Sequence, residues 1–281
     1  MKVSVIIPLY NKEHFIADTM QSVLTQTFVD YELIIINDGS TDESAKVVAT
    51  FSDNRIIYVE QNNKGVSIAR NKGINMARGE YIAFLDADDQ WHPDYLEKMI
   101  NLTTQYPTYS VFCSSQAKRP INTLPEGVSV IEDYCVYNYV FWTGCMVIKK
   151  EVFDVIGGFR EGIQLGEDSD MWLRICCKYT TVYLNEELAE HPYITENNLA
   201  RITDTTKSFP FWEWYNYPYP NTKSLYRYTT DQLVRCTEDL VRQSRYCDAW
   251  YFLKKTKGFS SIRPRIKLFL KIIFNIKTYF T

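Results

Sequence analysis

The chain has 281 residues, 46% of them hydrophobic, which is enough to form the core of one large domain or two small ones. Lys and Arg number 31 against 34 Asp and Glu, and the net charge of −3 argues against a general binder of nucleic acid. Seven cysteines without CxxC spacing indicate free thiols in a reducing compartment and argue against a zinc site.

The N-terminal segment has no secretory pattern. The chain goes directly from Met1 and Lys2 into the apolar run VSVIIPL, without a small-residue cleavage site. No stretch reaches the roughly 18 consecutive apolar residues that are needed to cross a bilayer. We therefore expect a cytoplasmic protein.

The first half of the sequence alternates between strand and helix patterns. Continuous apolar runs predict buried strands at 3–9, 31–37, 55–60 and 81–86. Helical spacing or helix-start signals predict helices at about 15–24, 41–51, 66–77 and 93–106. This order predicts an α/β fold with right-handed crossovers and a mainly parallel central sheet flanked by helices.

The second half is less regular. The patterns predict a strand and short helix at 145–159, a helix at 166–179 and a short strand at 181–185. Residues 186–223 are rich in Tyr, Pro, Asn and Trp and read as a long loop over a site. Whether 205–225 move as a lid stays open. Helical patterns follow up to the C-terminus.

Three polar segments each follow a predicted strand: PLYN at 8–11, NDGSTD at 37–42 and DADD at 86–89. Ligands of open α/β sheets bind beyond the carboxyl ends of the strands, so these segments should gather along one edge.

The DADD segment concentrates negative charge. Asp86, Asp88 and Asp89 destabilise the fold unless a cation or a hydrogen-bond donor offsets them. Mg²⁺ and Mn²⁺ prefer carboxylate oxygens and commonly share them with substrate phosphates. We therefore favour a metal site that holds a diphosphate. The alternative is that Asp89 or Asp94 caps the following helix.

Four segments in order resemble the family-two inverting glycosyltransferases, which have the GT-A nucleotide-sugar fold. They are VSVIIPLYNKEHFI, ELIIINDGSTDES, NKGVSIARNKGINMARGEYIAFLDADDQWHPDYLE and GGFREGIQLGEDSDMWLRI. The resemblance covers about residues 3–185. It implies a GT-A domain at 1–223, with a nucleotide-binding half at about 1–115 and an acceptor-binding half at about 116–223. The rest, 224–281, would be a helical C-terminal extension.

The resemblance also implies the reaction. A sugar would move with inversion from a nucleoside diphosphate, most readily UDP, to a hydroxyl of a glycan or lipid-linked acceptor in surface polysaccharide synthesis. Mg²⁺ or Mn²⁺ would be the cofactor. The donor sugar, the acceptor, the linkage and the oligomeric state stay open.

The residues that would bind the nucleotide sugar, by position in the family pattern, are Pro8, Tyr10, Asn11, Glu13, Asp38, Arg70, Asp86 and Asp88. Asp38 would accept a hydrogen bond from a base imino group, which favours uracil, and Arg70 would approach the base and phosphates. Asp88 would be the principal metal ligand, with Asp86 on the metal or the ribose. Each also has a local alternative, such as a turn for Asp38 or a solvated helix position for Arg70.

Inverting transfer needs a base that removes the proton of the acceptor hydroxyl. The base position of the family matches Asp168 in GEDSDMWLR, and Glu167 would position donor or acceptor. Acids at a helix start can instead complement the helix dipole. We favour catalysis for Asp168 and the dipole for Asp170.

Four further residues are candidates for the acceptor side of the site or for nearby positions. Trp142 and Gly144 would line the acceptor pocket, and Trp172 would either stack on a sugar ring or pack in the core. His191 precedes a proline and reads as an ordinary loop histidine.

The basic and apolar segment 263–281 predicts a helix that either lies in the headgroup region on the inner face of the membrane or docks on the domain.

Two rival functions remain in view. A sugar nucleotidyltransferase should carry a Gly-rich loop after its first strand, which PLYNKEHF lacks, and a non-catalytic nucleotide-sugar-binding scaffold would be expected to lack one of the acids.

Overall fold

The computed structural model describes residues 1–116, 127–132, 141–192, 228, 237–238, 240–243, 245–246 and 248–250. The chain divides into two compact units, one of residues 1–162 and 167–199 and one of residues 163–166 and 200–281. The sheet and the site described below belong to the first unit. Two segments lie outside the described residues: 205–225, whose movement as a lid stays open, and 263–281, expected either to contact the membrane or to dock on the domain. The domain boundary at 223 stays a prediction.

The N-terminal half forms a parallel sheet in the order β3-β2-β1-β4. The strands are β1 (Val3–Leu9), β2 (Tyr31–Asn37), β3 (Ile56–Glu60) and β4 (Tyr81–Phe84). Every residue of β2 is buried, because the strand is covered on both faces. This explains its continuous apolar run and confirms the predicted α/β class.

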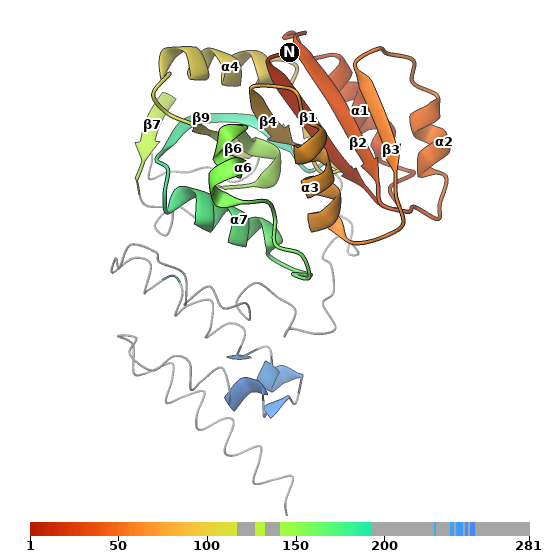
Figure 1. Ribbon diagram of the computed structural model, residues 1–281, viewed down its shortest axis with the longest axis vertical. Helices are drawn as coiled ribbons and strands as arrows, with labels where there is room; N and C mark the ends of the chain where they lie inside the picture. Colours follow the sequence, from red (N-terminus) through yellow and green to blue (C-terminus); the bar gives the residue numbers. More distant parts are fainter. Residues whose placement is uncertain are drawn as a thin grey trace, which may run out of the picture. The chain divides into compact units, whose positions relative to one another are not determined.

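Helices connect these strands: α1 (Ile16–Leu24), α2 (Ser44–Ala49) and α3 (Val66–Met76), with α4 (Tyr95–Gln105) after β4. Helix α3 packs against β1 and β2 in front of the sheet (Figure 1). A Cβ atom on Gly73 would lie 2.4 Å from Cγ2 of Ile6, so glycine permits this close approach. The close packing holds α3 beside the end of β4.

The second half continues the sheet with mixed strand directions. Its elements are β5 (Gln90–Trp91), β6 (Val111–Gln116), β7 (Gly127–Ile131), β8 (Met146–Lys149), β9 (Thr181–Glu190), η2 (Thr143–Cys145), α6 (Glu151–Ile156) and α7 (Glu167–Cys176). Strand β8 is antiparallel to β4 and β6, whereas β6 and β9 are parallel. The sheet is thus parallel in its first half and mixed in its second.

Strand β9 is longer than predicted. It continues to Glu190, so the predicted loop that starts at residue 186 is wrong for residues 186–190. The segment EELAE has little intrinsic strand preference, but β5 pairs with its C-terminal end, with Gln90 opposite Glu190 and Trp91 opposite Ala189. A tertiary pairing therefore decides the local structure here.

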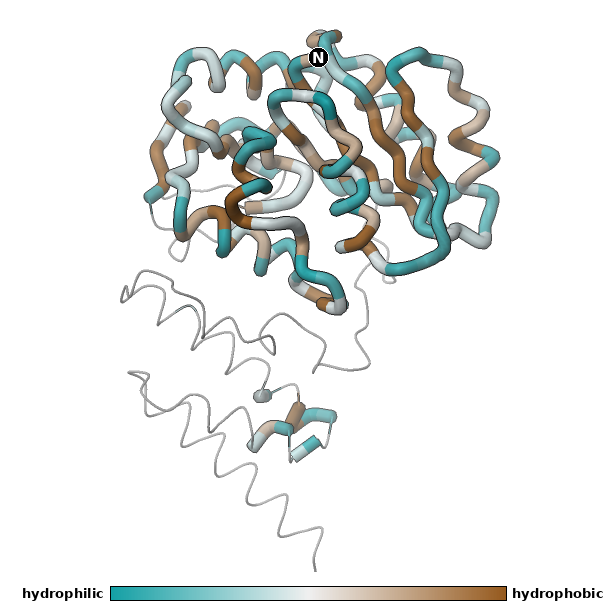
Figure 2. The backbone as a smooth tube through the Cα atoms, in the orientation of Figure 1, coloured by the Kyte–Doolittle hydropathy of each residue, from teal (hydrophilic) through white to brown (hydrophobic). Residues whose placement is uncertain are grey.

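Apolar residues lie along the central strands, while the connecting loops are largely hydrophilic (Figure 2). The largest fully buried side chains include Trp172, Tyr31, Tyr95, Tyr183, Phe84 and Phe112. Among the helices of the described residues, none has the length and hydrophobicity needed to span a lipid bilayer.

Candidate active site

The loops after β1 and β2 are joined by side-chain hydrogen bonds. Oδ1 of Asn11 accepts a bond of 2.8 Å from the backbone N–H of Thr41, and Oε2 of Glu13 accepts one of 2.7 Å from the N–H of Glu43. Asn11 has a φ of 50°, in the left-handed region that asparagine tolerates better than most residues. The two polar segments therefore lie together at one edge of the sheet, as their positions after strands predict.

Asp38 holds the segment that leads into α3. It is buried, and its two oxygens accept bonds of 2.7 Å from Nε2 of Gln61, 2.9 Å from the N–H of Lys64 and 2.7 Å from the N–H of Gly65. The sequence pattern did not reveal these three donors. Asp38 thus has an anchoring role, whatever it contributes to nucleotide binding.

Pro8 and Tyr10 lie at the carboxyl end of β1. Pro8 is the partner of Ile36 in the β1–β2 register, and the side chain of Tyr10 is 46% exposed. The exposed ring is available to stack on a planar ligand.

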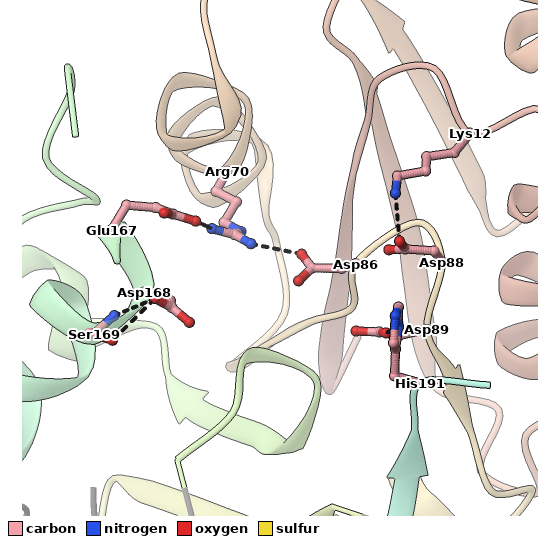
Figure 3. Close-up of polar contacts among 9 residues, drawn as sticks. All are labelled: Lys12, Arg70, Asp86, Asp88, Asp89, Glu167, Asp168, Ser169 and His191. Atoms are coloured by element: carbon pink, nitrogen blue, oxygen red, sulfur yellow. Dashed lines mark hydrogen bonds and ion pairs between the residues drawn. The ribbon is translucent and has the colours of Figure 1, made fainter. Parts of the chain in front are cut away.

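Arg70 links the two acidic segments of the site. Its Nη2 donates to Oδ1 of Asp86 at 2.7 Å, and its Nη1 donates to Oε1 of Glu167 at 2.8 Å (Figure 3). The side chain is only 3% exposed, and its guanidinium lies 5.1 Å from the centre of the Phe159 ring. Burial opposes the charge, but the carboxylates of Asp86 and Glu167 outweigh it and raise the pKa of Arg70. Arg70 therefore fixes the end of β4 against the start of α7.

The other two acids of DADD face different cations. Oδ2 of Asp88 is 2.5 Å from Nζ of Lys12, and Oδ1 of Asp89 is 2.6 Å from Nδ1 of His191 (Figure 3). One potential ligand atom each from Asp88, Asp89 and His191 lies within 4.8 Å of the others. This group forms a candidate metal centre.

The pairing of β5 with β9 explains this cluster. The antiparallel register that sets Gln90 opposite Glu190 also brings Asp89 opposite His191. The contact with Asp89 favours a role for His191 at the candidate metal centre over that of an ordinary loop histidine. The metal pair of Asp86 and Asp88 stays a prediction; Asp86 pairs with Arg70, and Asp88 belongs to the cluster of three.

The contact between Asp89 and His191 affects the pKa of both side chains. Burial raises the pKa of Asp89 to about 7, although its hydrogen bond with His191 acts in the opposite direction. The same hydrogen bond raises the pKa of His191. Two carboxylates with one imidazole form a donor set that suits Mn²⁺, and carboxylate oxygens also suit Mg²⁺. The residues present therefore fit a divalent cation.

Asp168 stands at the start of α7. Its Oδ1 accepts a hydrogen bond of 2.6 Å from the backbone N–H of Ser169. Burial, followed by the charge of Glu167, raises the pKa of Asp168 to about 6, although Arg70 lowers it. Such a carboxylate is ionised at neutral pH and basic enough to accept a proton.

Asp170 anchors the same helix. Its carboxylate is fully buried, 2.8 Å from Nε of Arg174 and 2.9 Å from Nη1 of Arg160. Arg174 also donates to the backbone carbonyls of Ile156 and Gly158. The helix-dipole interpretation of Asp170 is therefore incomplete, because ion pairs hold it in the core and fix the first turn of α7.

The sequence model of the family described as Glycosyl transferase family 2 matches residues 4–162, more than half of the chain. The chain belongs to this family. A relative from Bacillus subtilis (strain 168), TuaG, is named as a candidate teichuronic acid biosynthesis glycosyltransferase. It is 34% identical over 209 residues, which cover 69% of this chain and 80% of TuaG.

Other relatives of this chain are much longer than the aligned region. Glycosyltransferase GlyA of Streptococcus pneumoniae serotype 4 is 42% identical over 107 residues, which are 37% of this chain and 15% of GlyA. An uncharacterized glycosyltransferase of Rickettsia conorii is 33% identical over 217 residues, which are 74% of this chain and 34% of that protein. The match thus spans about a third or less of both.

Solved structures share the GT-A fold of this chain. Staphylococcus aureus TarS in complex with UDP-GlcNAc has a TM-score of 0.59 and 21% identity, over 68% of this chain and 58% of the other. The mannosyltransferase PcManGT of Pyrobaculum calidifontis, in complex with GDP-Man and Mn²⁺, has a TM-score of 0.57 and 18% identity, over 98% of this chain and 80% of the other. At these identities the likeness establishes the fold alone.

Trp172 and Trp142 occupy different environments. Trp172 is fully buried, and its ring centre lies 5.8 Å from Phe159 and 6.2 Å from Phe84. The prediction that Trp172 stacks on a sugar ring is therefore wrong, and the alternative prediction that it packs in the core is confirmed. Trp142 is partly exposed just before η2 and stays a candidate for the acceptor side.

Gly144 has a structural contact of its own. Its carbonyl accepts a bond of 2.6 Å from Nε1 of Trp91. A Cβ atom at Gly144 would be 3.5 Å from the Trp142 ring, an ordinary contact distance. Packing against the described residues therefore does not require glycine here, and the approach of an acceptor to Gly144 stays a prediction.

Proposed function

We propose that the protein transfers a sugar with inversion from a UDP-sugar to a hydroxyl of a glycan or lipid-linked acceptor in surface polysaccharide synthesis. The observation that carries this proposal is the chain of contacts from DADD to the start of α7. Arg70 bonds both Asp86 and Glu167, and Glu167 precedes the raised-pKa carboxylate of Asp168. This arrangement holds a donor-side acidic segment and a base at fixed positions relative to each other.

The nucleotide would bind at the edge formed by the loops after β1 and β2. Tyr10 offers an exposed ring for the base, with Pro8, Asn11, Glu13 and Asp38 around it. The preference for UDP is supported by the solved complexes of TarS with UDP and UDP-GlcNAc. The complex of PcManGT with GDP-Man makes a guanosine donor the alternative outcome.

The cation would be held by Asp88, Asp89 and His191, with Asp86 retained by Arg70. The imidazole ligand favours Mn²⁺ over Mg²⁺. When bound, such an ion offsets the negative charge of the departing diphosphate.

Asp168 would remove the proton from the acceptor hydroxyl. Ser169 holds Oδ1, and among the described residues no donor contacts Oδ2, which can therefore receive the proton. A positioned general base contributes a factor of about 10²–10⁴. Arg70 would keep Glu167 oriented beside it, and Asp170 would keep the first turn of α7 in place.

The acceptor class is supported by the name of TuaG, which refers to teichuronic acid biosynthesis. An acceptor linked to lipid would be met at the inner face of the membrane, and we propose a cytoplasmic protein that contacts this face. Trp142 and Gly144 would line the acceptor side.

A panel of nucleotide sugars, each with and without Mn²⁺, tests the proposal by thermal shift and by hydrolysis of the donor. We expect one UDP-sugar to raise the melting temperature most and to be hydrolysed only with the metal. Stabilisation without hydrolysis or transfer under any condition would favour a nucleotide-sugar-binding scaffold. If only GDP-sugars stabilise the protein, the proposal that the donor is a UDP-sugar is wrong.

A further inference from the structure

We propose that Lys12 is an exchangeable counter-cation of the candidate metal centre. Its ammonium group neutralises Asp88 in the metal-free protein, leaves when a divalent cation binds, and then contacts the diphosphate of the donor. The inference rests on the proposed function, because it takes a metal-bound nucleoside diphosphate as the ligand.

Lys12 and a divalent cation compete for the same oxygen atom. Nζ of Lys12 lies 2.5 Å from Oδ2 of Asp88, and Asp88 belongs to the cluster with Asp89 and His191. A cation coordinated by Asp88 would repel the ammonium at such short range.

The backbone of Lys12 is held by hydrogen bonds, whereas its side chain is partly exposed and is held by its ion pair with Asp88. The N–H of Lys12 donates to Oγ of Ser44 at 2.9 Å, and its carbonyl accepts from the N–H groups of Phe15 and Ile16 at 3.0 Å and 2.9 Å. The side chain is 28% exposed and lies over the Phe15 ring, with Nζ 5.7 Å from the ring centre. The ammonium can therefore move while the loop after β1 stays in place.

The three acids of DADD each have a cationic partner, but these partners differ in their freedom. Arg70 is 3% exposed and is bound to Glu167 as well as to Asp86. Lys12 has a compact charge on a flexible stem, and a lysine ammonium binds phosphate well as a point charge. Of Arg70 and Lys12, only Lys12 can therefore exchange its carboxylate partner for a phosphate.

Calorimetric titration of the full chain with MnCl₂, without nucleotide, tests the exchange. We compare wild type with Lys12→Met, which keeps an unbranched side chain, and with Lys46→Met as the charge-matched control. Lys46 is 79% exposed on α2 and pairs with Glu43. Asp88→Asn reports whether the binding is at this site. We expect Lys12→Met to bind Mn²⁺ about threefold or more tighter than Lys46→Met, since a competing ion pair is gone.

The second arm measures UDP binding at saturating Mn²⁺, the state in which the proposal places the Lys12 ammonium on the diphosphate. We expect Lys12→Met to bind UDP several-fold more weakly than Lys46→Met, and Lys12→Arg to retain most of the affinity. Melting curves of all variants verify that each is folded.

Mn²⁺ affinity in Lys12→Met equal to or weaker than in Lys46→Met overturns the exchange, including the case in which no variant binds Mn²⁺. Tighter Mn²⁺ binding with unchanged UDP affinity overturns the contact with diphosphate. The proposed function fails separately, if wild type transfers no sugar from any donor while the Mn²⁺ titrations still differ as expected.

Discussion

The two acidic segments of the site, DADD at 86–89 and EDSD at 167–170, look alike in composition but differ in how their charges are balanced. In DADD, Asp86, Asp88 and Asp89 each face a cationic group from another element. In EDSD, Glu167 and Asp170 are paired with arginines, whereas Asp168 accepts its hydrogen bonds from Ser169.

The comparison indicates how one protein assigns different tasks to similar side chains. A carboxylate beside an ammonium or imidazole is prepared to hold a cation. A partly buried carboxylate without a side-chain ion pair among the described residues has its pKa raised to about 6 and can act as a base. The following predictions test this division of roles.

The largest effect should come from Asp168→Asn. The variant keeps the shape of the side chain but cannot accept the proton, so we expect transfer to fall by about 10²–10⁴-fold with donor affinity within a few-fold of wild type. Initial rates and UDP-sugar titrations measure the two quantities. Asp154→Asn, at an exposed position on α6, is the matched control. Transfer within a few-fold of wild type would rule out Asp168 as the base.

Asp170→Ala should mainly reduce stability. It leaves Arg174 and Arg160 without their buried partner, a change that typically costs about 3–5 kcal/mol. Urea unfolding followed by circular dichroism measures the free energy of unfolding. Asp154→Ala should change it by about 0.5 kcal/mol or less. Equal effects of the two substitutions would mean that Asp170 does not anchor α7.

His191→Gln should weaken metal binding. Because the variant lacks one of three candidate ligands, we expect its affinity for Mn²⁺ to fall about 10- to 100-fold. Losses of this size are typical even when the substituted residue only contacts a metal ligand. Electron paramagnetic resonance of free Mn²⁺ gives the affinity. His92→Gln is the control, because the side chain of His92 is 60% exposed and outside the cluster. The assignment of His191 is wrong if both variants bind Mn²⁺ alike.

The pH dependence should show the smallest change. Since the base must be ionised, kcat/KM should decrease about tenfold per pH unit below the pKa of Asp168, about 6, and level off above it. In Arg70→Met the acidic limb should move to higher pH, because the charge of Arg70 lowers that pKa. A limb that stays in place, measured at saturating Mn²⁺, would show that Arg70 does not tune the base.

Local sequence patterns were sufficient where a segment interacts mainly with its neighbours in the chain. The apolar runs at 3–9 and 31–37 predicted β1 and β2, and their polar continuations predicted the ligand edge. They did not reveal that Asp38 accepts bonds from residues 61–65, or that Lys12 faces Asp88. The sequence shows a lysine two residues after PLY. It does not show that the side chain of this lysine points toward Asp88.

By itself, the sequence determined the α/β class, the order of the N-terminal elements, the family and the presence of acids after β4 and in the first turn of α7. Periodicity and turn residues encode these features locally. Only the tertiary structure decided which cation faces which acid. His191 reaches Asp89 because β5 pairs with β9 across about a hundred residues, and Trp172 enters the core because α7 packs its apolar face on Phe84 and Phe159. Such contacts depend on the free energy of the whole packed fold, which no local pattern specifies.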